Sequence, residues 1–329
     1  MKILILTEAS QKKGLGHVIR CMSVYNEAVA NNIDVTLIVN SDSCIKSFIN
    51  VQNGVVQNWL LNESVFRNII KNYDCVVIDS YDISDSFCNI LSETCKIPVF
   101  IDYIQKRVYF RGIVVDASVE PLKYNYSQNK KVKYLKGFDF VLLRDEFKPI
   151  NRRVIKENIT DILISLGGTD VRNLTPFIID ILKSEGVNLK IMCNENFKNV
   201  IDFNDYKNIQ LIYNPTPKII KKNMLESDIA ISSAGQTLNE LAVCQTPTIM
   251  IGVADNQHWN INLFKRQGFL FAGWWNDETL KNNIISCYNY YKAQKNRAIV
   301  INSIKSMIDG FGAARLIKEI LTWSDSEKY

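Results

Sequence analysis

The chain has 329 residues, of which 47% are hydrophobic, and 39 basic and 34 acidic residues give it a net charge of +5 at pH 7. This length and apolar content suffice for one large or two medium hydrophobic cores, and two domains are the expectation. The charges are spread along the chain without a basic tract, which argues against a nucleic-acid-binding arm. A mildly basic face would still attract phosphate ligands or anionic lipid.

The opening segment MKILILTEAS reaches Glu8 too soon to form the apolar core of a signal peptide, and no later run has the length of a membrane span. We therefore expect a cytoplasmic protein without an integral membrane segment. The eight cysteines are scattered and form no Cys-x-x-Cys pair. They predict reduced, mostly buried thiols rather than a zinc site or a disulfide framework, and we expect neither a metal nor a cofactor.

Short β-branched runs alternate with helix-like segments along the first half of the chain, and after a polar, charged stretch the alternation restarts. Such alternation predicts an α/β protein with parallel sheets covered by helices on both faces. The expected strands are residues 2–6, 34–39, 75–79, 98–102, 112–116 and 140–143 in the first half, and 161–166, 188–193, 209–213, 228–233 and 246–252 in the second.

Both halves begin alike, with a strand, a glycine-containing turn and a helix: ILILTEASQKKGLGHVIRC and ILISLGGTDVRNLTPFIIDIL. Two such halves predict two Rossmann-like domains facing each other across a cleft. We expect the first domain at residues 1–150 and the second at 151–302. A C-terminal helix at 303–325, interrupted by Gly310 and Gly312, is expected to return to the first domain.

The motif GLGHVIRC places His17 directly after Gly14 and Gly16, at the start of a helix. An imidazole with an ordinary pKa of about 6.5 can accept a proton from water or from a sugar hydroxyl at cellular pH. His17 is therefore a candidate general base, and the alternative is a histidine that caps its own helix. Arg20, one turn further on, can orient the histidine, meet a phosphate or lie solvated.

The turn LGGTD follows the first strand of the second half and contains Gly167, Gly168 and Thr169. Ligands of open α/β sheets bind where strand ends lead into helix N-termini. The glycines let the backbone approach a ligand, and the next helix would direct free N–H groups at an anion. The turn thus predicts a phosphate site, although a Gly-Gly turn can also simply connect a strand to a helix.

A second such turn, SSAGQTLNEL, supplies Ser233, Gly235, Gln236, Thr237 and Glu240. Its small residues allow close backbone approach, and the Glu240 carboxylate can accept hydrogen bonds from adjacent ribose hydroxyls. The alternative is that Glu240 is a capping-box partner of Thr237 or Gln236.

The segment VADNQHWN presents Asp255, Asn256 and Gln257, whose donors and acceptors suit sugar hydroxyls and acetamido groups. Asp and Asn are also favoured as solvated helix caps, which is the alternative here. The neighbouring His258 is not assigned a direct role.

Taken together, four motifs in this order resemble the UDP-sugar hydrolases of pseudaminic acid synthesis and the related spore-coat polysaccharide proteins. The motifs are GLGHVIRC, LLRDEF, LISLGGTDVRN and AISSAGQTLNELAVCQTPTIMIGVADNQ, and the resemblance covers roughly residues 1–270. That family is similar in fold to the GT-B glycosyltransferases, so the resemblance implies a GT-B-like fold for this chain.

The resemblance also implies roles for the residues above. His17 would activate a water that attacks the anomeric carbon of a UDP-linked 2,4-diacetamido-2,4,6-trideoxy sugar, with inversion and release of UDP. The Gly-Gly-Thr turn would hold the diphosphate, and the helix that carries Glu240 would meet the ribose. No metal is needed, because helix N-termini and backbone amides can stabilise the leaving diphosphate.

The chain departs from the family pattern in its first half. Leu6, Thr7 and Glu8 stand where the family has an Arg-x-Asp group, so the carboxylate is one carbon longer. Asp102-Tyr103 stands in place of paired aspartates, and VDAS replaces an Asn-Pro-like segment. Glu8 remains a candidate acid or base beside His17, and the identity of the substrate stays open.

Three functions are compatible with these features. The favoured one is a nucleotide-sugar hydrolase with water as the acceptor. The second is an inverting glycosyltransferase in which His17 takes a proton from a sugar or lipid-linked hydroxyl, with peripheral membrane contact. The third is a nucleotide-sugar binding protein without turnover.

Overall fold

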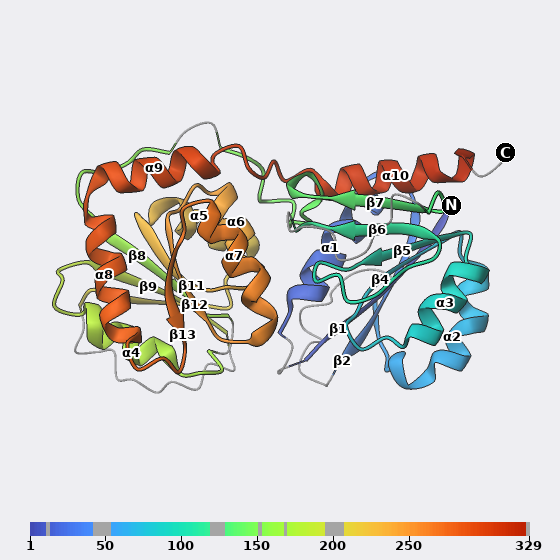
Figure 1. The fold of residues 1–329 in the computed structure, drawn as a ribbon, viewed down its shortest axis with the longest axis horizontal. Helices are drawn as coiled ribbons and strands as arrows, with labels where there is room; N and C mark the ends of the chain where they lie inside the picture. The colour runs from blue at the N-terminus through green and yellow to red at the C-terminus, as the bar shows by residue number, and fades with distance from the viewer. Residues whose placement is uncertain are drawn as a thin grey trace. The chain divides into compact units, whose positions relative to one another are not determined.

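The structure is a computed structural model that describes residues 1–10, 14–41, 54–118, 129–150, 153–167, 170–194 and 207–326. The chain forms two compact units (Figure 1). Unit 1 contains Met1–Asp145 and Gly310–Tyr329, and unit 2 contains Glu146–Asp309. Unit 1 is therefore discontinuous in sequence, whereas unit 2 is continuous.

Unit 1 is built on a parallel sheet of seven strands in the order β3-β2-β1-β4-β5-β6-β7. The chain runs outward from β1 to one edge and then returns to β4 on the other side of β1. The carboxyl ends of β1 and β4 therefore form the topological switch point, where ligands of open α/β sheets bind. The strands are β1 (Lys2–Ala9), β2 (Asp34–Ser41), β3 (Gly54–Val56), β4 (Cys75–Asp79), β5 (Ile97–Ile101), β6 (Gly112–Asp116) and β7 (Val132–Lys136).

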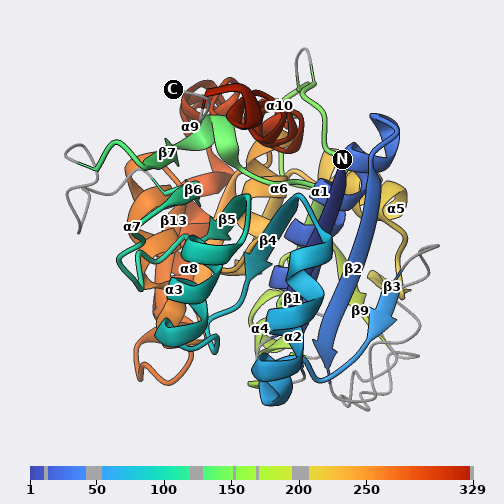
Figure 2. The same cartoon turned by 90° about the vertical axis from the view of Figure 1, so that its right-hand side faces the viewer.

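Helices cover both faces of this sheet, because successive strand residues point to opposite faces and both sets are apolar. Ile3 and Ile5 face a core shared with α1 and α10, whereas Leu4 and Leu6 face a core shared with α2 and α3. Figure 2 shows α2 and α3 in front of the sheet. The helices are α1 (Gly16–Ala30), α2 (Glu63–Ile69), α3 (Asp85–Thr94) and α10 (Gly312–Ser326), with the 3₁₀ turns η2 (Leu60–Asn62), η3 (Ile70–Asn72) and η5 (Phe138–Phe140).

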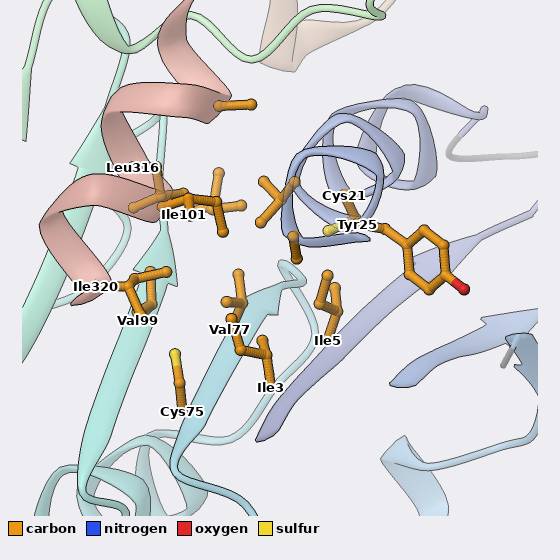
Figure 3. Packing of buried hydrophobic residues seen from close by; sticks show 14 of the residues in the cluster. Ile3, Ile5, Cys21, Tyr25, Cys75, Val77, Val99, Ile101, Leu316 and Ile320 are labelled. Carbon is orange, nitrogen blue, oxygen red and sulfur yellow. The ribbon is translucent and has the colours of Figure 1, made fainter. Parts of the chain in front are cut away.

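The last helix, α10, is an integral part of the core of unit 1. Its residues Leu316 and Ile320 are fully buried, and Figure 3 shows them beside Val99 and Ile101 of β5. Burying one such side chain contributes about 1.5–3 kcal/mol. Gly312 permits this close packing, since a Cβ there would lie 2.3 Å from the carbonyl oxygen of Val141.

The prediction of a strand at residues 140–143 is wrong. Phe140 ends η5, and Val141, Leu142 and Leu143 are buried without joining the sheet. The backbone N–H of Leu142 donates to the Tyr103 hydroxyl instead of to a neighbouring strand. The apolar run reflects burial beneath the start of α10, at Gly312, rather than strand pairing.

Unit 2 repeats the architecture with six parallel strands in the order β10-β9-β8-β11-β12-β13, so its switch point lies between β8 and β11. The strands are β8 (Asp161–Ser165), β9 (Asn188–Cys193), β10 (Ile209–Tyr213), β11 (Ile229–Ser233), β12 (Thr248–Gly252) and β13 (Leu270–Trp274). The helices are α4 (Leu174–Leu182), α5 (Pro217–Glu226), α6 (Thr237–Val243), α7 (His258–Arg266), α8 (Leu280–Lys292) and α9 (Gln294–Ile304), with the 3₁₀ turn η7 (Asp255–Gln257).

The two crossings between the units differ from the expected 150 and 303. Unit 2 begins at Glu146, because the Lys221 ammonium of α5 donates to the carbonyls of Glu146 and Lys148. Residues 303–304 end α9, which belongs to unit 2. Arg297 of α9 is buried and donates to the carbonyls of Lys156 and Glu157, so it fixes α9 to the first residues of unit 2. The returning helix starts only at Gly312.

Within the part of the chain that the structure describes, no helix is long and apolar enough to cross a bilayer. The seven cysteines in the described ranges are free thiols, and six of them are buried. Across the same residues, no group of three or more His, Cys, Asp or Glu side chains is arranged to hold a metal ion.

Candidate functional site

Four neighbouring strands of unit 1 carry a buried acidic residue at or just after their carboxyl ends. Glu8, Asp79 and Asp116 lie on β1, β4 and β6, and Asp102 directly follows β5. The strands are consecutive in the sheet order β1-β4-β5-β6, so the four side chains line one edge of the sheet. Their partners determine which of them is part of a reactive group.

Asp79 is the partner of His17, which lies in the first turn of α1. The loop before α1 is closed by Gly14, whose N–H donates to the Ser10 carbonyl and whose φ of +74° favours glycine. Gly16 then begins the helix, and the Nδ1 atom of His17 lies 2.6 Å from Oδ1 of Asp79. Both side chains are buried, with His17 5% and Asp79 0% exposed.

The hydrogen bond fixes the tautomer of the histidine. Burial alone would raise the pKa of Asp79, but the charges of Arg20 and His17 outweigh it, and the pKa lies below its ordinary value. An ionised carboxylate only accepts hydrogen bonds, so Nδ1–H of His17 is the donor, and in the neutral ring the lone pair lies on Nε2. Among the described residues, Nε2 has no hydrogen-bond partner. It is also absent from the buried, unpaired side-chain atoms of these residues, so solvent can reach it. Nε2 is the ring nitrogen left for a substrate.

Arg20 holds the same carboxylate from the other side. Its Nε donates to Oδ2 of Asp79 at 2.8 Å and its Nη2 to Oδ1 at 2.9 Å, a two-pronged contact. Burial lowers the pKa of Arg20, yet the neighbouring Asp79 raises it above the ordinary value. The guanidinium also lies over the ring of Tyr103 at 4.7 Å. Among the expected roles for Arg20, the structure favours orientation of the histidine through Asp79.

Glu8 acts on the same group through the backbone. It is buried, and its Oε1 accepts the N–H of Tyr81 at 2.8 Å. Tyr81 in turn packs edge-on against the His17 ring, with centroids 4.4 Å apart. This contact favours a positioning role for Glu8 over the acid or base role expected for it.

The remaining two carboxylates are satisfied by their own loops. Asp102 accepts hydrogen bonds from the backbone N–H groups of Lys106 and Arg107 and from the Tyr109 hydroxyl. Asp116 accepts them from Gln105, Ser118 and Tyr134, and burial raises its pKa. Both therefore stabilise the loops at this edge of unit 1.

In unit 2, the predicted phosphate turn follows β8. Gly167 is exposed with φ of +84°, whereas Gly168 and Thr169 lie outside the described residues. Asp170 is buried, and its carboxylate accepts the N–H groups of Leu174 at 3.0 Å and Thr175 at 2.7 Å. These first amides of α4 are therefore occupied by a side chain, which corrects the expectation that they point at an anionic ligand.

The second turn, after β11, leads into α6. Ser233 is buried, while Gly235, Gln236 and Thr237 are half-buried. Gln236 precedes the helix without capping it by its side chain, and its Oε1 accepts from Asn239. Gln236 therefore does not supply the N-cap half of a capping box. Glu240 lies in the first turn of α6 and is 3% exposed.

The third turn, after β12, contains η7. Asp255 and Asn256 are exposed, and the Oε1 atom of Gln257 accepts the N–H of Val253 at 2.8 Å. The Gln257 side chain is thus bonded within its own turn, and among the described residues no side chain caps η7 or α7. The capping alternative is therefore not supported, and Asp255 and Asn256 remain accessible to a ligand. Asn260 of α7 donates to the carbonyl of Ala234 and so ties this turn to the one after β11.

The structure thus gathers the predicted residues into two groups, one in each unit. Glu8, His17 and Arg20 meet at the β1/β4 switch point of unit 1. The turns after β8, β11 and β12 are neighbours at the carboxyl edge of unit 2. Sequence reasoning missed Asp79, Tyr81 and Tyr103. Asp79 was detectable as the acidic end of a buried strand, residues 75–79, once that strand was placed beside β1.

Curated relatives of the chain include sugar-nucleotide hydrolases, although no protein-family model matches it. It is 29% identical over 273 residues to an uncharacterized protein of Methanocaldococcus jannaschii, covering 76% of this chain and 55% of the relative. It is 26% identical over 308 residues to the Helicobacter pylori protein named pseudaminic acid cytidylyltransferase and UDP-2,4-diacetamido-2,4,6-trideoxy-β-L-altropyranose hydrolase, covering 92% and 53%. It is 26% identical over 278 residues to the Campylobacter jejuni hydrolase of the same UDP-sugar, covering 82% and 98%. The chain spans about half the length of the first two relatives.

Solved structures with the same fold include MurG of Acinetobacter baumannii, with a TM-score of 0.66, 14% identity and coverage of 98% of this chain and 100% of that one. They also include the UDP-GlcNAc 2-epimerase of Neisseria meningitidis bound to UDP-GlcNAc, with a TM-score of 0.64, 12% identity and coverage of 98% and 100%. The expected GT-B-like fold is confirmed. The resemblance to the UDP-sugar hydrolases of pseudaminic acid synthesis is confirmed as well.

Proposed function

We propose that this protein hydrolyses a UDP-linked diacetamido-trideoxy sugar of the kind named for two of its relatives, with His17 as general base. The observation that carries the proposal is the Asp79–His17 pair. A carboxylate holds Nδ1 of the imidazole at 2.6 Å and leaves Nε2 as a proton acceptor at the switch point of unit 1.

The reaction needs one proton acceptor and one leaving group. Water attacks the anomeric carbon from the face opposite the nucleotide, its oxygen forms the new bond, and its proton passes to Nε2 of His17. The bond between the anomeric carbon and the diphosphate oxygen breaks, and UDP leaves with the electron pair, so the sugar is released with inversion. A positioned general base typically contributes about 10²- to 10⁴-fold to such a step.

The neighbours of His17 support this step. The Asp79 carboxylate stabilises the imidazolium that forms when Nε2 takes the proton, and Arg20 keeps that carboxylate ionised and oriented. Tyr81 restrains the ring from its edge, with Glu8 holding the backbone of Tyr81. Among the described residues, Gly14 and Gly16 have no neighbour within 4 Å of a Cβ position, which supports room for a substrate beside His17.

Unit 2 is proposed to bind the nucleotide. In this proposal the turn at Gly167–Thr169 receives the diphosphate, and Ser233, Gly235, Gln236 and Thr237 approach it with backbone and hydroxyl groups. Glu240 would meet the ribose, and the turn at Asp255–Gln257 would meet the sugar hydroxyl and acetamido groups. Supporting this assignment, the three turns are neighbours at one sheet edge.

A glycosyltransferase is the alternative, and the fold shared with MurG favours keeping it. The same His17 would then accept the proton of an acceptor hydroxyl instead of water. Only that function would call for contact with a membrane-bound acceptor.

The distinguishing experiment incubates the purified protein with UDP-, GDP- and CMP-sugars and follows release of free nucleotide. Release from a UDP-sugar without an acceptor is expected, and His17→Ala should lower it by at least about 100-fold while UDP affinity stays nearly unchanged. Release only after adding an acceptor would support the transferase. Saturable binding without release under either condition would leave a binding protein and end the enzymatic proposal.

A further inference from the structure

The phosphate turn of unit 2 lacks the positive end of a helix that a diphosphate would otherwise use. The carboxylate of Asp170 is 6% exposed and already takes the N–H groups of Leu174 and Thr175. A second anion at the start of α4 would meet this carboxylate rather than free amides. Binding of a diphosphate near Gly167 therefore needs a positive charge from elsewhere.

The sequence of the three turns contains a single cation. Residues 166–173, 234–236 and 253–257 read LGGTDVRN, AGQ and VADNQ, so Arg172 is their one basic residue, beside Asp170 and Asp255. It is exposed and therefore accessible to a ligand. No other lysine or arginine of these turns competes for the role.

Arg172 is held in place by the neighbouring turns. Its Nε donates to the carbonyl of Val253 at 3.1 Å, and its guanidinium lies over the ring of Trp275, 4.2 Å from the centroid. Val253 follows β12 and Trp275 follows β13, while Arg172 itself follows β8. Since β11 lies between β8 and β12 in the sheet, the side chain reaches past the end of β11, where the second turn begins.

The Nε bond and the Trp275 contact leave two nitrogen atoms of the guanidinium to consider, Nη1 and Nη2. Among the described residues, neither Nη1 nor Nη2 of Arg172 has a hydrogen-bond or ion-pair partner. The Nε bond and the aromatic contact orient the guanidinium plane, so less side-chain freedom is lost when a ligand binds. Two parallel N–H groups with a fixed orientation match two oxygens of a phosphate.

We infer that Arg172 is the diphosphate-binding residue of unit 2, with Nη1 and Nη2 donating to phosphate oxygens of a nucleoside diphosphate. Trp275 and the Val253 carbonyl are its positioning groups. The inference rests on the proposed function, because it assumes that unit 2 binds the nucleotide. The sequence predicted this site from glycines, hydroxyls and helix amides alone, and the inference adds the guanidinium of Arg172 to them.

The test compares ligands with and without phosphates. Calorimetric titration of the full-length protein with UDP and with uridine is performed for the wild type, Arg172→Gln and Arg172→Lys. The matched control is Lys222→Gln, which removes an exposed charge from α5 of the same unit. Arg172→Gln should weaken UDP binding about 10- to 100-fold, the range of a charge-assisted hydrogen bond, and leave uridine binding unchanged. Arg172→Lys should fall between the two, and Lys222→Gln should match the wild type.

A double-mutant cycle tests the positioning role. Trp275→Leu should weaken UDP binding less than Arg172→Gln does, and its effect should disappear in the Arg172→Gln background. UDP affinity of Arg172→Gln equal to that of the wild type would overturn the inference and leave the proposed function standing. Equal weakening of UDP and uridine would also overturn it, because it would show a structural role. A wild type that binds no UDP would overturn both.

Discussion

At the scale of single residues, Asp79 is the shared hydrogen-bond acceptor of the site in unit 1. Its two oxygens accept from Arg20 and from His17. Arg20 and His17 are both buried with it, and neither has another acidic partner among the described residues. Removing one member of a buried pair leaves an uncompensated charge, which is costly. The pair therefore links stability to function, since the same carboxylate supports the fold through Arg20 and the proposed chemistry through His17.

Asp79→Asn should separate these two contributions. The neutral amide cannot stabilise an imidazolium, so nucleotide release should fall by about 100-fold or more. The unfolding free energy should drop by about 3–5 kcal/mol, because Arg20 keeps a buried charge without a counter-ion. Steady-state release and urea unfolding measure the two effects. The control Asp85→Asn removes an exposed carboxylate paired with Arg107, and it should change stability by no more than about 1 kcal/mol. Unchanged release in a folded Asp79→Asn protein would remove the carboxylate from the mechanism.

At the scale of elements, the buried central strands could be predicted because their apolar runs are continuous, whereas three strands were missed. The missed strands β3, β7 and β13 all lie at sheet edges and are only partly buried. β3 has three residues, β7 is mixed with lysines, and β13 contains Gly273, which weakens a strand pattern. His17 was predictable from the local motif GLGH. Its partner Asp79 could not be found from the local motif, since the contact depends on β4 pairing with β1 across 62 residues of sequence.

The contribution of α10 to unit 1 can be tested with two adjacent residues. Ile320 is fully buried against the sheet, and Leu321 is 40% exposed on the same helix. Ile320→Ala should lower the unfolding free energy of unit 1 by about 2–5 kcal/mol, the usual cost of a large cavity. Leu321→Ala should cost less than about 1 kcal/mol. Equal effects of the two substitutions in chemical denaturation would show that α10 does not pack as described.

At the scale of the whole molecule, each unit has its own sheet and its own covering helices, and the proposed roles are divided between them. The proposed base, His17, is in unit 1, and the turns proposed to bind the nucleotide are in unit 2. A nucleotide without its sugar should therefore stabilise one unit selectively, because a ligand raises the stability only of the unit whose folded form binds it.

Calorimetric unfolding with and without UDP tests this division. We expect two transitions, of which Ile320→Ala lowers only that of unit 1. UDP at 100 times its dissociation constant adds about 2.7 kcal/mol to unit 2, which corresponds to roughly 5–10 °C in its midpoint. The shift should be the same in His17→Ala, whose substitution lies in unit 1. If UDP instead raised only the transition that Ile320→Ala lowers, the nucleotide would bind to unit 1, and the proposed division of roles would be wrong.

The position of α10 after unit 2 in the sequence has a consequence for biosynthesis. During translation, the strands of unit 1 leave the ribosome first, but the helix that covers Val99 and Ile101 follows only after all of unit 2 has emerged. Unit 2 can complete its core while the nascent unit 1 still exposes an apolar strip of its sheet. Such a strip favours aggregation and chaperone binding until α10 docks, so unit 1 should be prone to aggregation during this interval.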